Sequence, residues 1–266
     1  MRIAFVSDIH GNLAALQAVI DDIKRRQINT VVNLGDTLSG PLLPQETAAL
    51  LRPLDWLHVS GNHERQVLTL PPNRQNKSDA FTSTAIDGTS KTWISGHANP
   101  GDPRLHEGQM WPDRLGPDVA LCHGSPRSDI EYLLETPVGE VTLLATTTEI
   151  EERLDNRLPP HITLLACGHT HVPRAVRTAS GLLIVNPGSV GLPAYDDDHP
   201  LPHSSYHRIE TGSPDARYAV VEKVDGQWRY EPISVAYEFE PMAALADHNG
   251  RPDWAHALRT GYMSRA

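Results

Sequence analysis

Aspartate, histidine and asparagine side chains, which often bind divalent metals, recur in this sequence directly after short apolar runs. The run 162–166 is followed by Cys167-Gly168-His169-Thr170-His171, and the run 3–6 is followed by Ser7-Asp8-Ile9-His10. The runs 31–34, 56–59 and 119–121 end in Gly35-Asp36, in Ser60-Gly61-Asn62-His63-Glu64 and in Cys122-His123-Gly124. Imidazole and carboxylate ligands together suit manganese, iron, cobalt, nickel or zinc. We therefore expect five buried strands to deliver one site at their carboxyl ends.

Each of these motifs carries little weight alone. Asp8 and His10 are two residues apart, as are His169 and His171, and a strand period of two places both members of a pair on one side. Such pairs also occur by chance, and a lone histidine is more often a hydrogen-bonded structural residue than a ligand. Five motifs that each follow an apolar run are far harder to assign to chance. The two cysteines lack thiolate-ligand spacing and are interpreted as small buried hydrophobes.

The first sixty residues alternate between expected strands and helices. Strands are predicted over 2–6, 30–34 and 54–59, and helices over 12–26 and 45–51, the first of them capped by Asn12. This alternation implies right-handed crossovers and a parallel sheet covered by helices. In such sheets ligands bind outside the carboxyl ends of the strands, where the motif residues lie.

The remaining chain changes pattern after His171. Before it we expect helices over 78–95 and 138–158, strands over 119–121 and 162–166, and a long ordered loop over 96–117. After it, short strands over 174–177, 182–185, 217–224 and 227–235 predict a mainly antiparallel second half. Residues 186–216 are predicted to be a polar loop whose acidic run, 196–198, is solvated surface, and 240–262 to form one or two helices. No repeat or linker divides the chain, so we expect a single domain over 1–266.

Composition narrows the classes of function. The net charge of −10 argues against general nucleic-acid binding, which needs a basic face. It leaves room for a small phosphorylated substrate, because bound cations would reverse the local field. No apolar run is long enough for a membrane helix, and the N-terminus does not resemble a signal peptide. Two cysteines favour a reducing compartment, so we expect a cytoplasmic protein.

The five motifs, in this order, resemble those of the calcineurin-like metallophosphoesterase superfamily. Chain length and the segment His123-Gly124-Ser125-Pro126 are most similar to its small bacterial phosphodiesterase branch, and Asn186-Pro187-Gly188-Ser189 is similar to a later family segment. One departure is visible, because Glu64 stands where the family usually has aspartate. We expect the longer carboxylate still to orient His63.

The resemblance implies a four-layer α/β/β/α sandwich with a two-metal centre. By the family pattern, one divalent metal would be held by Asp8, His10, Asp36 and His171. The other would be held by Asp36, Asn62, His123 and His169, with Asp36 bridging. Two cations about 3.5–4 Å apart can share a hydroxide that acts as the nucleophile. Manganese is the expected metal, with iron, zinc, nickel and cobalt open, and His63 is the implied general acid.

The function that the resemblance implies is hydrolysis of phosphodiester bonds in a small phosphorylated substrate. The alternatives are a phosphomonoesterase or phosphoprotein phosphatase, a dinucleoside polyphosphate hydrolase, and a non-catalytic scaffold of the same fold. The presence of His63 and of all seven ligand positions favours an enzyme. A structural metal site is disfavoured, because such sites are usually closed by four ligands that include cysteine. His97, in the expected loop, is more simply a surface residue, and Trp93 a packing residue. The natural substrate and the oligomeric state stay open.

Overall fold

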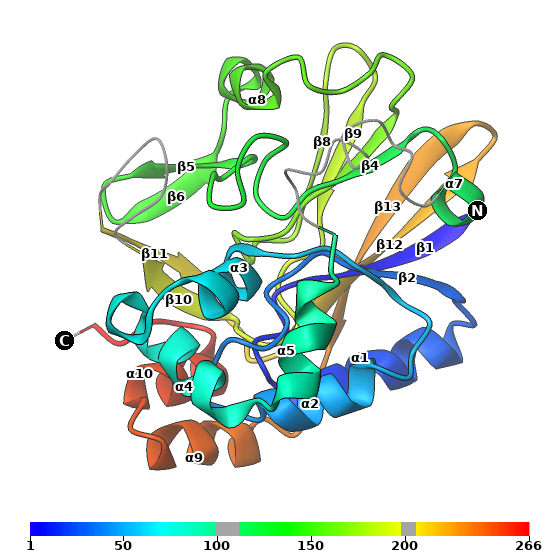
Figure 1. Ribbon diagram of the computed structural model, residues 1–266. Coiled ribbons are helices and arrows are strands. Elements are labelled where there is room, and N and C mark those ends of the chain that lie inside the picture. Colours follow the sequence, from blue (N-terminus) through cyan, green and yellow to red (C-terminus); the bar gives the residue numbers. More distant parts are fainter. Residues whose placement is uncertain (99–111, 198–205, 266) are drawn as a thin grey trace.

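Two β-sheets packed face to face form the centre of the molecule (Figure 1). The computed structural model describes residues 1–98, 112–197 and 206–265. The first sheet has the strand order β13-β12-β1-β2-β3 and the second the order β4-β7-β9-β8. The first sheet comprises β1 (Arg2–Val6), β2 (Thr30–Asn33), β3 (Leu57–His58), β12 (Ala216–Val224) and β13 (Gln227–Val235). The second comprises β4 (Val119–Leu121), β7 (Leu164–Ala166), β8 (Arg174–Arg177) and β9 (Leu183–Asn186).

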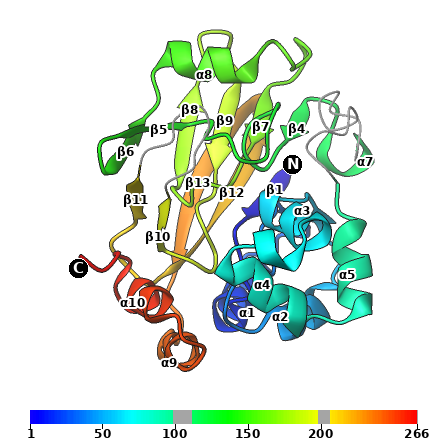
Figure 2. The same ribbon diagram turned by 60° about the vertical axis from the view of Figure 1, so that its left-hand side comes forward.

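Apolar side chains fill three successive layers around these sheets. Phe5 and Val32 of the first sheet share a buried cluster with Leu121 and Leu164 of the second. On the opposite face of the first sheet, α1 (Leu13–Arg25) and α2 (Pro44–Leu51) pack against β1, β12 and β13. On the outer face of the second sheet lies α8 (Thr147–Leu154), which buries Ile150 there. The arrangement is the expected α/β/β/α sandwich (Figure 2).

Strand direction brings the motif-bearing ends together. β1, β2 and β3 run parallel, with Ile3 opposite Thr30 and Val32 opposite Leu57. In the second sheet β4, β7 and β9 are also parallel. β12 and β13 are antiparallel, joined by Asp225-Gly226, whose positive φ values of 50° and 78° suit a tight hairpin. These predicted strands and the turn are confirmed, although β3 is shorter than expected.

Two of the predicted helices are wrong in extent. The stretch 78–95 is divided into α4 (Lys77–Ala85) and α5 (Gly88–Ser95), because Asp87 caps the second helix by accepting a hydrogen bond from the backbone N–H of Ser90. The stretch 138–158 begins instead with a hairpin of β5 (Glu135–Val138) and β6 (Val141–Leu144), turning at Gly139, whose φ is +61°. Leu143 and Leu144, which lie within the predicted helix 138–158, are instead 53% and 51% exposed on β6.

The polar segment 186–216 also contains regular structure. β10 (Ala194–Asp197) pairs antiparallel with β11 (His207–Glu210). Parts of this predicted loop (198–205) and of the loop predicted over 96–117 (99–111) lie outside the described residues. The chain closes with the predicted helices, α9 (Glu240–His248) and α10 (Pro252–Thr260). The other described elements are α3 (Asn62–Thr69), η1 (Pro72–Arg74) and α7 (Pro112–Leu115).

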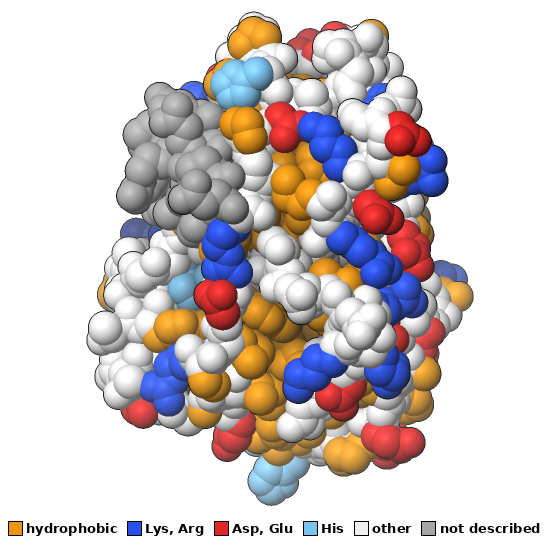
Figure 3. Space-filling model, turned by 90° about the vertical axis from the view of Figure 1, so that its right-hand side faces the viewer, with side chains coloured by type: hydrophobic (Ala, Val, Ile, Leu, Met, Phe, Trp, Pro, Cys, Tyr) orange, Lys and Arg blue, Asp and Glu red, His pale blue; other side chains and the backbone are white. Residues whose placement is uncertain are grey.

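The surface is mixed in character. On the face that holds the start of β1, basic and acidic side chains lie side by side around apolar ones (Figure 3). Within the described ranges, no helix has the length and apolar character needed to cross a membrane.

Candidate metal centre

The predicted ligands meet in two neighbouring groups at the carboxyl ends of the strands. Asp8, His10 and His171 form one group, and Asp36, His123 and His169 form the other. Within each group the candidate ligand atoms all lie within 4.8 Å of one another. Asn62 joins the second group, because its Oδ1 lies 3.1 Å from Nε2 of His123. The structure thus brings together all seven positions that the sequence nominated.

The reason for this convergence differs from the one expected. β1 ends at Val6 and β7 at Ala166, so the motif residues lie in loops and a strand period does not place them. Five of the ligand candidates have a left-handed backbone, which non-glycine residues rarely adopt: φ is 55° at Asp8, 53° at His10, 53° at Asp36, 68° at His169 and 57° at His171. Such conformations cost about 1–3 kcal/mol each and gather at functional sites. The sharp turns also separate His169 and His171 into different groups.

Backbone carbonyls fix how three of the histidines are protonated. Nδ1 of His10 lies 2.7 Å from the Ser39 carbonyl oxygen, Nδ1 of His171 lies 2.8 Å from that of Leu192, and Nδ1 of His123 lies 2.8 Å from that of Leu34. A carbonyl only accepts, so each Nδ1 carries a proton and donates it. In a neutral ring Nε2 is then a lone-pair donor, as in metal-binding histidines oriented by a second partner.

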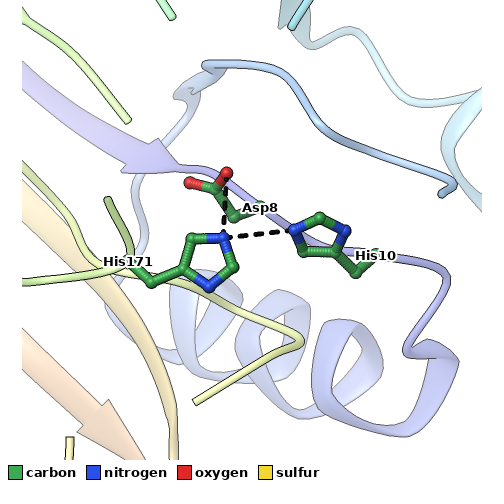
Figure 4. A group of neighbouring side chains, drawn as sticks. All are labelled: Asp8, His10 and His171. Carbon is green, nitrogen blue, oxygen red and sulfur yellow. Dashed lines mark hydrogen bonds and ion pairs between the residues drawn. The ribbon is translucent and has the colours of Figure 1, made fainter. Parts of the chain in front are cut away.

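These lone pairs face one another. Nε2 of His10 lies 3.2 Å from Nε2 of His171, which in turn lies 3.3 Å from Oδ1 of Asp8 (Figure 4). Oδ1 of Asp8 is buried and accepts no hydrogen bond within the described part of the chain. Two imidazole nitrogens and a carboxylate oxygen aimed at one point repel one another unless a cation lies between them. The donor set therefore fits a divalent transition metal.

The charge states agree with this fit. Burial, together with His171 and His63, lowers the pKa of His10 to about 3. Burial and then His123 lower the pKa of His169 to about 4. Both rings are neutral at pH 7, as a ligand must be. Burial opposes ionisation of Asp8, yet positive charge at the position facing His171 outweighs burial and lowers the pKa of Asp8 to about 2, so this carboxylate requires a proton or a cation beside it.

His123 shows the same demand for positive charge in the second group. Its Nε2 lies 2.9 Å from Oδ2 of Asp36. Burial favours the neutral ring, but Asp36 and Asp8 more than offset burial and raise the pKa of His123 to about 10. The proton on His123 thus balances carboxylates that a bound cation would otherwise balance.

Glu64 does not orient His63, contrary to expectation. Its carboxylate accepts hydrogen bonds from the backbone N–H groups of Asp36 (2.8 Å), Thr37 (2.7 Å) and Gly61 (2.8 Å). A buried glutamate at the start of α3 therefore ties the Asp36 loop to the Asn62 loop. This joins two motifs that supply ligands to the same group.

Asp79 orients His63 instead. Oδ1 of Asp79 lies 2.7 Å from Nδ1 of His63, and it also accepts from the Ser39 hydroxyl at 2.7 Å. Asp79 is fully buried on α4 and belongs to none of the five motifs, so spacing could not reveal it. Burial alone would lower the pKa of His63, but Asp36 and Asp79 outweigh it and raise that pKa to about 9. His63 is therefore protonated at neutral pH.

A cavity of about 700 Å³ opens onto both groups. It is lined by His63 and by the ligand candidates His10, Asp36, Asn62, His169 and His171. Tyr195 also lines it, with its ring centroid 4.6 Å from that of His171. Asp196 is exposed, as expected of solvated surface, and Asp197 is half-buried, and both line this cavity on β10. Asp198 lies outside the described residues.

Comparison with known proteins agrees with the fold and the motifs. The model of the calcineurin-like phosphoesterase superfamily domain matches residues 1–211. The chain belongs to this superfamily of phosphoesterases.

Similar proteins extend along nearly the whole chain. A protein of Methanocaldococcus jannaschii, described as uncharacterized, is 27% identical over 256 residues, which cover 95% of this chain and 94% of that protein. The crystal structure of a metallophosphoesterase from Sphaerobacter thermophilus is 24% identical, covers 97% of this chain and 98% of its own, and has a TM-score of 0.68. A hypothetical protein from Pyrococcus horikoshii OT3 is 15% identical, covers 99% of each chain and has a TM-score of 0.69. These likenesses confirm the fold class.

Proposed function

We propose that this phosphoesterase hydrolyses phosphodiester bonds with the help of two divalent cations. Asp8, His10, Asp36 and His171 would hold one cation, and Asp36, Asn62, His123 and His169 the other. The observation that carries the proposal is the pair of adjacent ligand groups that open onto one cavity beside a protonated His63. A structural site would be closed by its ligands. Bound cations would lower the pKa of a water molecule and stabilise charge on the phosphoryl oxygens.

Asp36 and Asn62 suit their proposed places for different reasons. Asp36 has two oxygens, of which Oδ2 faces His123 and Oδ1 accepts from the backbone N–H of His63 at 2.9 Å. Its two lone-pair-bearing oxygens allow it to serve both groups. Asn62 offers a neutral carbonyl oxygen, which adds no negative charge. The centre therefore keeps more of its attraction for an anionic substrate.

His63 is the proposed general acid. With Nδ1 bound to Asp79, the proton on Nε2 is the one available to the departing oxygen of the substrate. Nε2 lies 3.9 Å from Oδ2 of Asp36, and this distance supports a role for His63 next to the proposed cation sites. A positioned general acid typically contributes about 10²–10⁴-fold in rate.

The choice of diester over monoester rests on space around the reacting centre. A cavity of about 700 Å³ accommodates substituents on both sides of a phosphoryl group. We propose manganese as the metal, a small phosphorylated molecule as the substrate and one domain over the whole chain. Cys122 and Cys167 are both free and buried, which favours a reducing, cytoplasmic location. A monoesterase, a dinucleoside polyphosphate hydrolase and a scaffold are the alternatives that the experiment must exclude.

The test compares bis-p-nitrophenyl phosphate with p-nitrophenyl phosphate after metal stripping and addition of Mn²⁺. We expect Mn²⁺-dependent cleavage that favours the diester and is lost in Asp36→Asn. Faster cleavage of the monoester would replace the diesterase with a monoesterase. Absence of turnover of either ester by folded protein that binds two Mn²⁺ would point to a narrow substrate, such as a dinucleoside polyphosphate. Folded protein that binds no metal would support the scaffold.

A further inference from the structure

Three cationic side chains line the cavity in addition to the ligand groups. They are Arg74 at the end of η1, Lys77 at the start of α4 and Arg251 directly before α10. Nη1 of Arg251 donates to the Ser78 hydroxyl at 2.9 Å. Because Ser78 lies on α4, this bond joins the starts of two helices at the cavity wall. Arg251 is thereby fixed on the cavity wall that Arg74 and Lys77 also line.

Arg251 is held in place by hydrogen bonds that use only some of its N–H donors. Its Nε donates to Asp253 at 2.9 Å and its Nη2 at 2.6 Å, and its guanidinium lies 5.4 Å from the centroid of the Trp254 ring. A guanidinium has five N–H donors. Asp253 takes two and Ser78 takes one, so two remain for a ligand. The side chain is only 16% exposed, which limits the entropy that a ligand would have to remove.

Among the described residues, Arg74 and Lys77 contribute positive charge to this wall that is not balanced by a nearby carboxylate, unlike that of Arg251. Both are exposed, and neither makes an ion pair with any residue in 1–98, 112–197 or 206–265. Asp253 already balances Arg251. In a chain with a net charge of −10, two unbalanced cations on a cavity wall favour an anionic ligand there. The carboxylates of Asp196 and Asp197 line the cavity from β10 and disfavour an anion on that strand.

We propose that Arg74, Lys77 and Arg251 form a subsite for a second phosphate group of the substrate. The preferred substrate would then be a phosphodiester that carries an additional phosphate, with the scissile group at the metal centre and the second group on this wall. Lysine and arginine suit a phosphate dianion because it accepts several charge-assisted hydrogen bonds at once. This inference rests on the proposed function, since it assigns the scissile group to the metal centre.

The test uses two ligands that differ only in the second phosphate. Binding of thymidine 3′,5′-bisphosphate and of thymidine 5′-phosphate to the Mn²⁺-loaded protein is measured by calorimetry. The matching p-nitrophenyl esters of the 5′-phosphate, with and without the 3′-phosphate, are compared as substrates. We expect the 3′-phosphate to improve affinity and to lower KM by about tenfold in the wild type. The double variant Arg74→Gln/Lys77→Gln should lose this advantage, so that its KM values for the two esters become equal, with a much larger rise for the ester that carries the 3′-phosphate.

The control is Lys24→Gln, which removes an exposed lysine of α1 outside the cavity and should leave the advantage intact. The subsite is refuted if the wild type binds both nucleotides equally, or if the double variant weakens both to the same degree. Calorimetry keeps the two proposals separable. Protein that prefers the bisphosphate but cleaves neither ester would retain the subsite and reject the diesterase. Protein that cleaves both esters alike would retain the diesterase and reject the subsite.

Discussion

The molecule contains two clusters of histidines that differ in the partners of their ring nitrogens. In the metal centre, His10, His123 and His171 each bond a backbone carbonyl through Nδ1 and direct Nε2 at carboxylates or other ligands. In the second cluster His58 and His97 stack with ring centroids 4.8 Å apart and planes at 12°. Both ring nitrogens of His97 are buried and, among the described residues, without a hydrogen-bond partner. Buried ring nitrogens occur in both clusters, so the partner of each nitrogen, rather than burial, distinguishes a candidate ligand.

The second cluster behaves as a packing unit. Trp93 of α5 contacts both rings edge-on, at 5.1 Å from His58 and 4.6 Å from His97. The interpretation of His97 as a surface residue is therefore wrong, whereas Trp93 packs as expected. Backbone bonds from Ala98 N–H to His58 O (3.0 Å) and from Ser60 N–H to Ala98 O (2.6 Å) pass beside the stack. The stack thus fastens the end of α5 to the segment that leads into Asn62.

The largest expected contrast is in metal affinity. His171→Ala removes a nitrogen that faces both His10 and Asp8, so we expect Mn²⁺ affinity at that group to fall by more than about 100-fold. His97→Ala removes a half-buried ring whose nitrogens are also inaccessible but face no candidate ligand, so Mn²⁺ affinity should change less than about threefold. Calorimetric titration of metal-free protein gives both values. Equal losses in the two variants would show that burial alone, rather than nitrogen partners, controls the site.

A smaller effect is expected at His63. Its Nδ1 is hydrogen-bonded to Asp79, whereas neither ring nitrogen of His97 has a hydrogen-bond partner among the described residues. Asp79→Asn replaces the carboxylate that raises the pKa of His63, so that pKa should fall from about 9. A general acid works while protonated, so the alkaline loss of kcat should begin at lower pH in the variant. At pH 8 we expect kcat to fall by about tenfold with little change in KM. A pH profile of bis-p-nitrophenyl phosphate hydrolysis measures this shift.

Ser39→Ala is the matched control, because it removes another hydrogen bond to Oδ1 of Asp79 while keeping the carboxylate. In Ser39→Ala we expect the alkaline loss of kcat to occur at the same pH as in the wild type. An Asp79→Asn profile that only scales down, with the same alkaline limb, would assign Asp79 a purely structural role.

Most residues of the candidate metal centre could be nominated from the sequence because of where they stand along the chain. Asp8, Asp36 and His123 each follow an apolar strand, and parallel strands present their carboxyl ends at one edge. The positive φ values that aim Asp8 and His171 leave no trace in spacing, so the strand-period argument nominated residues that do converge, but through a backbone geometry that it did not anticipate. Asp79 was missed because its helix meets His63 only through tertiary packing.

The structures of two other regions were harder to predict from the sequence. Apolar spacing over 138–158 suggested one helix, yet Gly139 permits a turn and Thr146 caps a new helix, so local backbone preferences prevail. The cavity wall formed by Asp196 and Asp197 depends on pairing of β10 with β11, ten residues later. Short polar strands carry little periodicity, and only their partner defines them.

A separate expected effect is on acid stability and comes from the stacked pair. Burial lowers the pKa of His58 to about 4, and burial together with His58 holds the pKa of His97 well below its usual value. The unfolded chain takes up these protons below about pH 6.5, whereas the folded protein does not. The contribution of these two histidines to the free energy of unfolding is therefore complete above pH 6.5, and it is lost as the pH falls toward 4. At pH 5 the titration of His58 should lower the free energy of unfolding by about 2 kcal/mol, and His97 should act in the same direction.

Replacement of one member isolates this contribution. His97→Phe keeps an aromatic ring against His58 and Trp93 but cannot bind a proton, so its free energy of unfolding should decline less between pH 7 and pH 5 than that of the wild type. Urea denaturation of the metal-free proteins at both pH values gives the difference, and His161→Phe, at an exposed site, is the control. His10 and His169 titrate alike in all three proteins and cancel in the comparison. Parallel declines would mean that the stack accepts a proton while the protein is folded. The stacked pair would then not contribute to the loss of stability in acid.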